Sequence, residues 1–226
     1  MAKNKPEEIH TKIDDINDSL SSVEQKVQNN QKIIMWATIA LAVVACAILV
    51  YVYAIRRPGI QAANDAIGQA DIELAMGNDS IALMQYEQIA DEYGYDAGNR
   101  AKLNAAILLY QKGEWQKALD YASQYKHSED IIGASAKALE GDCYVNLKNY
   151  EEAIDCYKQA VKISDKNPMY TPLFLMKEAT VQRELKNYTA EAELYQQILS
   201  DYPEYQAATQ INIEKFLARA KAQAGE

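Results

Sequence analysis

The sequence holds few of the residues that build metal sites and nucleophilic centres. Histidine occurs only as His10 and His127, far apart in the chain, and cysteine occurs three times. No CxxC, HExxH or GxSxG motif and no glycine-rich phosphate loop is present. Because a zinc site takes several His or Cys ligands and a catalytic nucleophile needs a neighbouring base, we expect no metal, no cofactor and no enzymatic activity.

The three cysteines give little support for a disulfide. Cys46 lies within an apolar run, where a small, soft residue is ordinary packing material. Cys143 and Cys156 fall on what we expect to be two different helices, at offset heights. Since Cα atoms more than about 7 Å apart cannot be bridged, free thiols are favoured, with a disulfide between these two cysteines as the alternative.

Proline and glycine are scarce, with five and nine residues, whereas Ala, Leu, Tyr, Gln, Lys and Glu dominate. This composition favours helices over sheets and predicts an all-α protein. The formal net charge is −9, and the sequence has no basic stripe. Both features argue against nucleic-acid binding and against attachment to an anionic membrane surface.

Charge is entirely absent from one stretch, Ile33–Ile55. As a helix rising about 1.5 Å per residue it covers roughly 34 Å, enough for the roughly 30 Å hydrocarbon core of a bilayer. Trp36 lies near one end and tyrosines near the other, where aromatic rings prefer the headgroup region. We therefore expect the chain to cross a membrane through residues 33–55, in a transmembrane helix over 33–57 that Pro58 stops. A buried core helix is the weaker alternative because the stretch lacks a polar face, and a cleaved signal peptide does not fit behind a long polar tail.

The tail before this stretch, residues 1–32, carries apolar residues at alternating gaps of four and three. This heptad pattern predicts an amphipathic helix that associates with a second copy as a short coiled coil, giving a homo-oligomer. The alternative is a helix that lies on the bilayer or docks on a partner, although its polar face lacks the excess of Lys and Arg typical of interfacial helices. The candidate self-association residues are Ile9, Ile13, Ile16, Leu20, Val23 and Val27.

The clearest copy of a repeated pattern is residues 134–167. Gly141 and Ala153 are small, so two antiparallel helices can approach closely, and Tyr144 and Tyr157 fill the space that this creates. The pattern resembles the 34-residue tetratricopeptide repeat in the places of its Gly, Tyr and Ala residues. The resemblance implies hairpins of two helices, stacked into an α-solenoid.

Looser copies of the same pattern occupy the rest of residues 58–226, which we take as one repeat domain. The turns between the paired helices begin at Gly77, Gly113, Lys148 and Lys186, so the pattern recurs every 35 to 38 residues. In the last copy the small residue arrives one position late, at Ala192 rather than Glu191. Tyr205–Ala222 then reads as one amphipathic helix that caps the stack with a polar outer face.

A stack of such hairpins offers a concave groove lined by the first helix of each hairpin. The residues expected there are mostly apolar or small, which suits an apolar or helical segment of another protein better than a bound carboxylate. The alternative is that they pack against neighbouring hairpins or against the capping helix. The expected groove residues are Ile67, Asp71 and Leu74, then Leu103, Ile107 and Tyr110, then Ala138, Asp142 and Val145, and finally Met176, Thr180 and Arg183.

The whole arrangement, a short tail, one span and a loose tetratricopeptide domain, resembles the ancillary subunits of the bacterial Sec translocon. The resemblance implies a single-pass inner-membrane scaffold with a periplasmic repeat domain, and with the translocon, periplasmic chaperones or exported clients as partners. Charges close to the span are balanced, whereas the five lysines of the whole tail favour a cytoplasmic N-terminus. Two alternatives remain, a structural oligomer without a client groove and a cytosol-facing receptor on a membrane.

Overall fold

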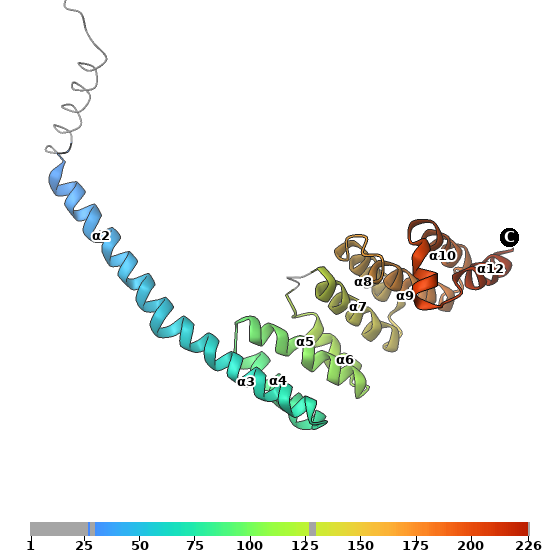
Figure 1. Cartoon of the computed structure of the whole chain (residues 1–226), viewed down its shortest axis with the longest axis horizontal. Coiled ribbons are helices and arrows are strands. Elements are labelled where there is room, and N and C mark those ends of the chain that lie inside the picture. The colour runs from blue at the N-terminus through green and yellow to red at the C-terminus, as the bar shows by residue number, and fades with distance from the viewer. Residues whose placement is uncertain (1–26, 28–29, 127–129, 226) are drawn as a thin grey trace, which may run out of the picture. The chain divides into compact units, whose positions relative to one another are not determined.

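The computed structural model describes residues 27, 30–126 and 130–225, and these residues form helices and turns without a strand. The chain divides into two compact units, Met1–Pro58 and Gly59–Glu226. Figure 1 shows the paired helices of the second unit following one another along the chain. The all-α class expected from the composition is confirmed.

The first unit contains helix α2 (Gln31–Val50) and the π-helical segment η1 (Tyr51–Arg56). No residue of either segment is buried. Within the described residues, the helical run from Gln31 to Ala75 is long and apolar enough to cross a membrane, with a mean hydropathy of 2.8 in its most apolar window. An all-round apolar surface of this kind is what a lipid-facing helix presents.

The expected helix stop at Pro58 is wrong, because helix α3 (Arg57–Ala75) runs through it. The backbone N–H of Arg57 donates to the carbonyl of Val52, five residues back. Such a π turn is wider than an α turn, which gives the proline ring room where it would otherwise meet the carbonyl four residues back. Gly59 also has a packing role, since a Cβ there would lie 2.7 Å from the hydroxyl of Tyr95.

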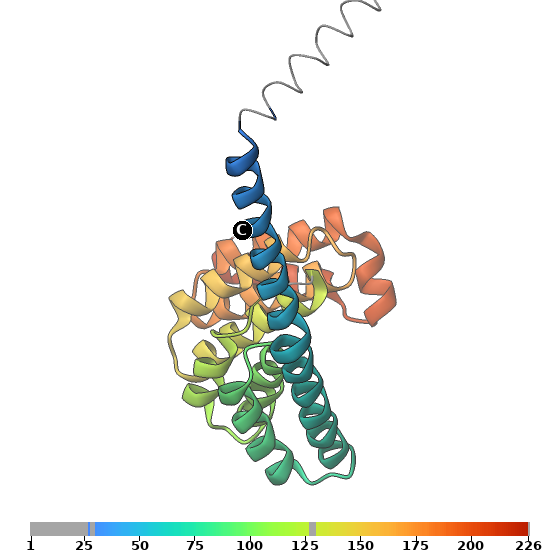
Figure 2. The same cartoon turned by 90° about the vertical axis from the view of Figure 1, so that its left-hand side faces the viewer.

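The second unit consists of antiparallel hairpins followed by two short helices (Figures 1 and 2). The hairpins pair α3 with α4 (Asp79–Glu92), α5 (Asp96–Gln111) with α6 (Trp115–Ala122), α7 (Asp130–Asn146) with α8 (Tyr150–Ile163), and α9 (Tyr170–Glu184) with α10 (Tyr188–Asp201). The short helices are α11 (Pro203–Thr209) and α12 (Ile213–Ala224). This is the predicted α-solenoid of helix hairpins.

One type of turn joins the two helices of each hairpin. Its first residue has a positive φ in all four, 80° at Gly77, 79° at Gly113, 63° at Lys148 and 60° at Lys186. The next residue donates its N–H to a carbonyl five residues back, as Asn78 does to Glu73 at 2.9 Å. This is the Schellman ending of a helix, and it stands at the four predicted positions.

Small residues let the paired helices approach, as expected. A Cβ on Gly141 would lie 2.7 Å from a ring carbon of Tyr157, so that the ring of α8 packs directly on the backbone of α7. Ala82, Ala118 and Ala153, each five residues after its turn begins, are fully buried. Tyrosines are the large partners of these positions, and the packing role assigned to them from the sequence is confirmed.

The buried core follows the stack as three successive clusters, one over α3 to α6, one over α7 to α9 and one over α9 to α12. Cys143 lies in the first cluster, which ties α7 to the hairpins before it. Both Cys143 and Cys156 are buried and free. Burial raises the pKa of the Cys143 thiol to about 12 and that of Cys156 to about 11, so both thiols stay protonated at neutral pH.

The end of the stack differs from the single capping helix that was expected. The helical conformation is interrupted at Gln210, which has a φ of 60°, and α12 starts only at Ile213. The side chain of Gln206 accepts the N–H of Ile213 at 2.7 Å, and that of Asn212 accepts the N–H of Lys215 at 2.8 Å. These polar side chains satisfy the backbone at the break, and α12 then packs on α10 as the cap.

Candidate functional site

The candidate site is a groove formed by the first helices of three successive hairpins, α5, α7 and α9. It encloses a hollow of about 440 Å³. Its apolar walls are Leu103 and Ile107 of α5, Ile131, Ile132, Ala136, Ala138 and Leu139 of α7, and Tyr170, Leu173 and Phe174 of α9. Ser135, Asp142 and Lys177 are its polar residues.

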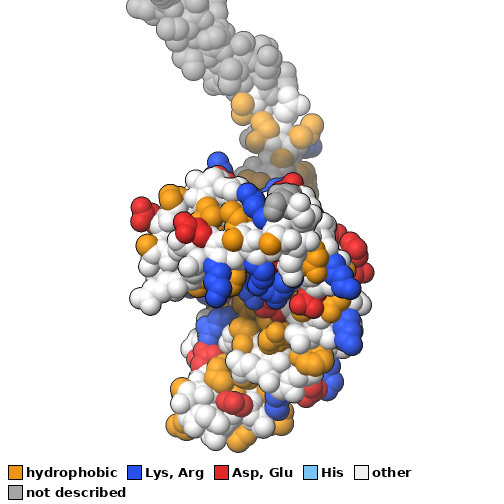
Figure 3. Space-filling model, turned by 90° about the vertical axis from the view of Figure 1, so that its right-hand side faces the viewer, with side chains coloured by type: hydrophobic (Ala, Val, Ile, Leu, Met, Phe, Trp, Pro, Cys, Tyr) orange, Lys and Arg blue, Asp and Glu red, His pale blue; other side chains and the backbone are white. Residues whose placement is uncertain are grey.

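Several of these apolar side chains have no cover in the fold. Ile107, Ile131, Ile132, Tyr170 and Leu173 are each between 37% and 44% exposed. A lone exposed apolar residue is ordinary, but a group of them around a hollow is typical of a binding surface. Figure 3, which looks onto the C-terminal end of the stack, likewise shows apolar side chains exposed in groups between charged ones.

A polar cluster centred on Asp142 closes one end of this hollow. Lys177 donates to both carboxylate oxygens of Asp142 at 2.7 Å, and the hydroxyl of Tyr157 donates to one of them at 2.7 Å. Burial, with a further contribution from the negative charge of Asp142, raises the pKa of Tyr157. The carboxylate therefore holds α7, α8 and α9 together and keeps Lys177 at the edge of the groove.

A smaller hollow of about 190 Å³ continues the groove beyond this cluster. Asn146 there donates to the hydroxyl of Tyr110 at 3.1 Å and to the carbonyl of Asp142 at 2.8 Å. Burial raises the pKa of Tyr110, and the charge of Asp142 adds to this effect. The remaining walls of the smaller hollow are Val145, Tyr157, Lys177, Thr180 and Val181.

The first hairpin repeats the arrangement around Asp142. Asp71 of α3 accepts a hydrogen bond of 2.6 Å from the Tyr86 hydroxyl of α4 and forms an ion pair with Arg100 of α5. Each Asp stands six residues before a turn and each Tyr nine residues after its start, so the repeat register brings both pairs together. Asp71 and Asp142 thus each join three consecutive helices.

The predicted groove residues fall into three groups in the structure. Leu103, Ile107, Ala138 and Asp142 line the larger hollow, and Tyr110, Val145 and Thr180 line the smaller one. Ile67 lies buried in the first core cluster and lacks the free surface that was expected, whereas Met176 is partly buried against the third cluster and lies outside both hollows. Asp71, Leu74 and Arg183 lie outside both hollows, Asp71 paired with Arg100 and Arg183 with Glu184.

Nine residues that line the larger hollow were not predicted from the sequence: Ile131, Ile132, Ser135, Ala136, Leu139, Tyr170, Leu173, Phe174 and Lys177. A signal for most of them is present, since α7 and α9 carry matching residues at steps of three, four and three. These are Ile132, Ser135, Leu139 and Asp142 on α7, and Tyr170, Leu173, Lys177 and Thr180 on α9. This stripe begins in the N-terminal half of each helix, one turn or more before the positions that were predicted.

The candidate self-association residues Ile9, Ile13, Ile16, Leu20 and Val23 lie outside the described residues, and Val27, the last of the set, is exposed. Their association therefore stays a prediction.

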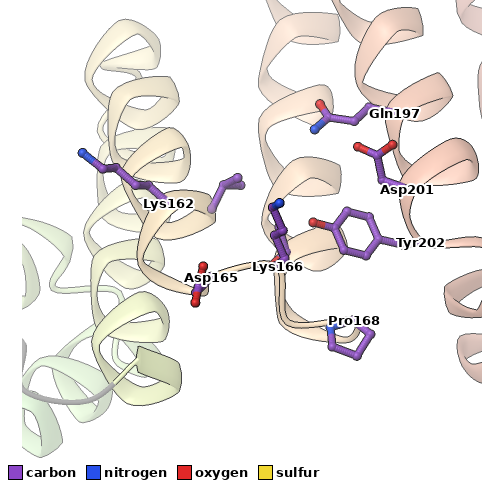
Figure 4. Close-up of a pocket in the computed structure, with 9 residues that line it drawn as sticks. Lys162, Asp165, Lys166, Pro168, Gln197, Asp201 and Tyr202 are labelled. Atoms are coloured by element: carbon purple, nitrogen blue, oxygen red, sulfur yellow. The ribbon is translucent and has the colours of Figure 1, made fainter.

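A third hollow, which is separate from the groove and has a volume of about 740 Å³, lies between the loop after α8 and helix α10 (Figure 4). Lys166 projects from the loop toward Tyr202, while Asp201 and Gln197 reach in from α10. Charged side chains of both signs line it, and it lacks the uncovered Ile and Leu side chains of the groove. Among the described residues no three His, Cys, Asp or Glu side chains gather as metal ligands.

Comparison with known proteins agrees with the repeat architecture. Models of the tetratricopeptide repeat match residues 67–130, 134–167 and 174–205. A comparison with curated proteins gives no match.

Solved structures with the same fold include the crystal structure of MamA protein. Its TM-score is 0.59 at 13% identity, covering 72% of this chain and 82% of that one. A tetratricopeptide repeat protein from Parabacteroides merdae has a TM-score of 0.55 at 16% identity, covering 91% of this chain and 74% of that one. At these identities the likeness shows the fold alone. The three matched segments and the hairpins that they cover show that the chain is a tetratricopeptide repeat protein.

Proposed function

We propose that the protein is a membrane-anchored scaffold whose groove binds an apolar, helical segment of another protein. The observation that carries the proposal is the hollow between α5, α7 and α9, with its uncovered Ile, Leu and Tyr side chains. Tetratricopeptide repeats as a class are binding scaffolds, and a concave apolar surface suits the apolar face of a helix. Because these side chains are already more than half buried, covering the rest of one Ile or Leu stabilises a complex by about 1 kcal/mol.

The Asp142–Lys177 pair supports a role in fixing the orientation of the bound segment. The pair stands where the two hollows of the groove meet, and Lys177 is one-third exposed. A few polar groups in an apolar pocket give orientation and specificity more than affinity. A bound segment is therefore expected to place a polar residue or helix end at this point and apolar residues on one side of it.

Two groove variants test the proposal, Ile107→Asp and Leu173→Asp, each made in the full-length chain. A charge placed in the hollow should reduce the yield of specific co-purified partners by about tenfold or more, because a buried unpaired carboxylate costs several kcal/mol. Leu185→Asp is the matched control, since Leu185 has the same 39% exposure as Ile107 but lies in a turn outside the groove. Unchanged helicity by circular dichroism shows that a variant is folded. Retention of the same partners by both groove variants would refute the groove as the binding site.

We further propose that α2 anchors the chain in a bacterial inner membrane, with a cytoplasmic N-terminus and a periplasmic repeat domain. The apolar surface of α2 and the five lysines before Ile33 support this orientation. In that position the scaffold would serve protein export, with the translocon, periplasmic chaperones or exported clients as partners. A structural oligomer and a cytosol-facing receptor are the competing functions.

Labelling of a single engineered cysteine separates the orientations. Gln223→Cys, at an exposed position of α12, is introduced into a Cys46→Ser background, in which the two remaining thiols are buried. A thiol reagent that crosses the outer but not the inner membrane should label the cysteine in intact cells. Labelling only after the inner membrane is opened would place the domain in the cytosol.

A further inference from the structure

The outer face of the first hairpin, formed by α3 and α4, carries large apolar side chains without cover. Five residues before each turn, the later hairpins bury Leu108, Cys143 and Val181 to 4%, 0% and 2% exposure, within clusters that reach the preceding hairpin. The same place in the first hairpin holds Ile72, which is 54% exposed. The face that stacks on a neighbour elsewhere in the domain is thus open here.

Ile72 belongs to a group of exposed residues at the turn end of this hairpin. Met76, in the turn that follows α3, is 70% exposed, and Ile81 and Met84 of α4 are 44% and 61% exposed. Ile81 and Met84 are three residues apart, so both lie on one side of α4. Terminal repeats normally present a polar outer face to water. Four uncovered Ile and Met side chains on one terminal hairpin, with Ile72 at the place where later hairpins stack, indicate a surface that binds something.

The polar half of this outer face lies further along the two helices. Gln69 of α3 and Gln85, Gln88 and Glu92 of α4 line a shallow hollow of about 200 Å³. The side-chain oxygen of Gln85 is buried and has no hydrogen-bond donor among the described residues. A buried acceptor left unpaired is costly, so this oxygen favours a ligand that brings a donor.

Apart from Arg57 at the start of α3, the charge of the first hairpin has one sign only. Residues 58–92 contain seven acidic residues and no Lys, Arg or His, whereas each later hairpin mixes both signs. Asp71 pairs with Arg100, the first basic residue after Arg57. The seven acidic residues are Asp65, Asp71, Glu73, Asp79, Glu87, Asp91 and Glu92.

We infer that this outer face docks a basic amphipathic helix of another protein, at a site separate from the groove. Exposed Met and Ile side chains, of which Met adapts readily to different shapes, receive the apolar side of such a helix. Its Lys and Arg residues are attracted by the acidic charge and supply donors to the Gln85 oxygen. A second copy of this chain fits poorly, because two equally acidic faces repel one another, and an anionic bilayer is repelled for the same reason.

The test uses the full-length chain in nanodiscs of zwitterionic phosphatidylcholine and a fluorescent 14-residue helical peptide that places Leu on one face and Lys on the other. Anisotropy, corrected for empty nanodiscs, should show binding that weakens steeply with salt. Replacing every Lys of the peptide by Glu should abolish it. The substitutions Ile72→Ser and Met84→Ser together should weaken binding by about tenfold or more, which corresponds to about 1.4 kcal/mol per factor of ten.

A charge variant and its matched control complete the test. Neutralising two exposed acids of α4 with Asp79→Asn and Glu92→Gln should weaken binding by about tenfold and flatten its salt dependence. The matched control neutralises two exposed acids of α8, Glu151→Gln and Glu152→Gln, and should change the affinity by less than about twofold.

Three results would overturn the inference. One is equal weakening by the α4 and α8 charge variants, because the peptide would then sense only the net charge. Another is loss of binding in Ile107→Asp, which would place the peptide in the groove and leave the outer face without a ligand. The third is a dimer of the full-length chain that Ile72→Ser and Met84→Ser dissolve, which would make a second copy the occupant.

Discussion

The ion pair between Glu191 of α10 and Arg219 of α12 allows a sharp prediction about how the stack is capped. Glu191 occupies the place held by Ala82, Ala118 and Ala153 in the earlier hairpins, and it is fully buried. Arg219 donates to one of its carboxylate oxygens at 2.5 Å, while the other oxygen has no partner among the described residues. A charged residue has thus replaced the small residue, and its only described counter-charge comes from the cap.

The two single substitutions should have very different effects. Arg219→Ala leaves a buried carboxylate without its cation, which costs about 3–5 kcal/mol in comparable buried pairs. Glu191→Ala restores the small residue of the repeat pattern and leaves Arg219, about one-third exposed, free to turn toward water. We expect a cost of about 1 kcal/mol or less for Glu191→Ala and for the double variant, and therefore a coupling of about 2–4 kcal/mol.

Urea unfolding of the full-length chain in detergent, followed by circular dichroism, measures this cycle. Because repeat stacks can unfold in parts, hydrogen exchange of the α12 backbone amides gives the local readout, and Arg219→Ala should accelerate it most. Equal destabilisation by Arg219→Ala and Glu191→Ala, with additive effects in the double variant, would show that the pair does not hold the cap.

Two further predictions concern the packing and the pH dependence of the hairpins. Gly141→Ala should destabilise the domain by about 1–3 kcal/mol in urea unfolding, because the new Cβ meets the ring of Tyr157. Gly68→Ala is the control: no atom lies within 4 Å of its new Cβ, so it should be neutral or stabilising by up to about 1 kcal/mol. Burial and the hydrogen bond to Asp71 raise the pKa of Tyr86 to about 12 from an ordinary value near 10. The stability that neutral Tyr86 contributes is therefore intact below pH 10 and is lost as the pH rises to about 12. Tyr86→Phe should lose about 1 kcal/mol at pH 7 and show a shallower loss of stability than the parent between pH 10 and 12; equal slopes would contradict this reading.

The repeat register explains why so much of the stack could be predicted from the sequence. A turn that needs a left-handed residue, and a helix crossing that needs a small one, leave marks at fixed spacing, and Gly77, Lys148 and Gly141 occur where the register puts them. The breaks in helices were harder to place. Pro58 lies inside a helix because a π turn precedes it. The C-terminal helix is interrupted at Gln210, where the side chain of Gln206 accepts the backbone N–H of Ile213 at the start of α12.

The groove was predicted less completely than the fold for a related reason. The register says which helix faces the groove but not how far along each helix the neighbours leave it open. Ile107 and Asp142 fell on the predicted stripe, whereas Leu173 lies a turn earlier on its helix, where the neighbouring hairpin leaves it partly exposed. Ile67 carries the predicted spacing but is buried by its own hairpin and the next. Exposure of this kind depends on how successive hairpins pack, which spacing along one chain does not encode.

The most direct test of the central proposal is site-specific photocrosslinking in the native membrane. A benzoylphenylalanine residue at position 107 lies in the groove, and one at position 185, of equal exposure in the natural chain, lies outside it. We predict that position 107 crosslinks to a discrete protein partner and that Leu173→Asp in the same chain removes the crosslink, while position 185 gives no such product. Equal products from both positions, or a crosslink from position 107 that Leu173→Asp leaves intact, would contradict a role of the groove in binding.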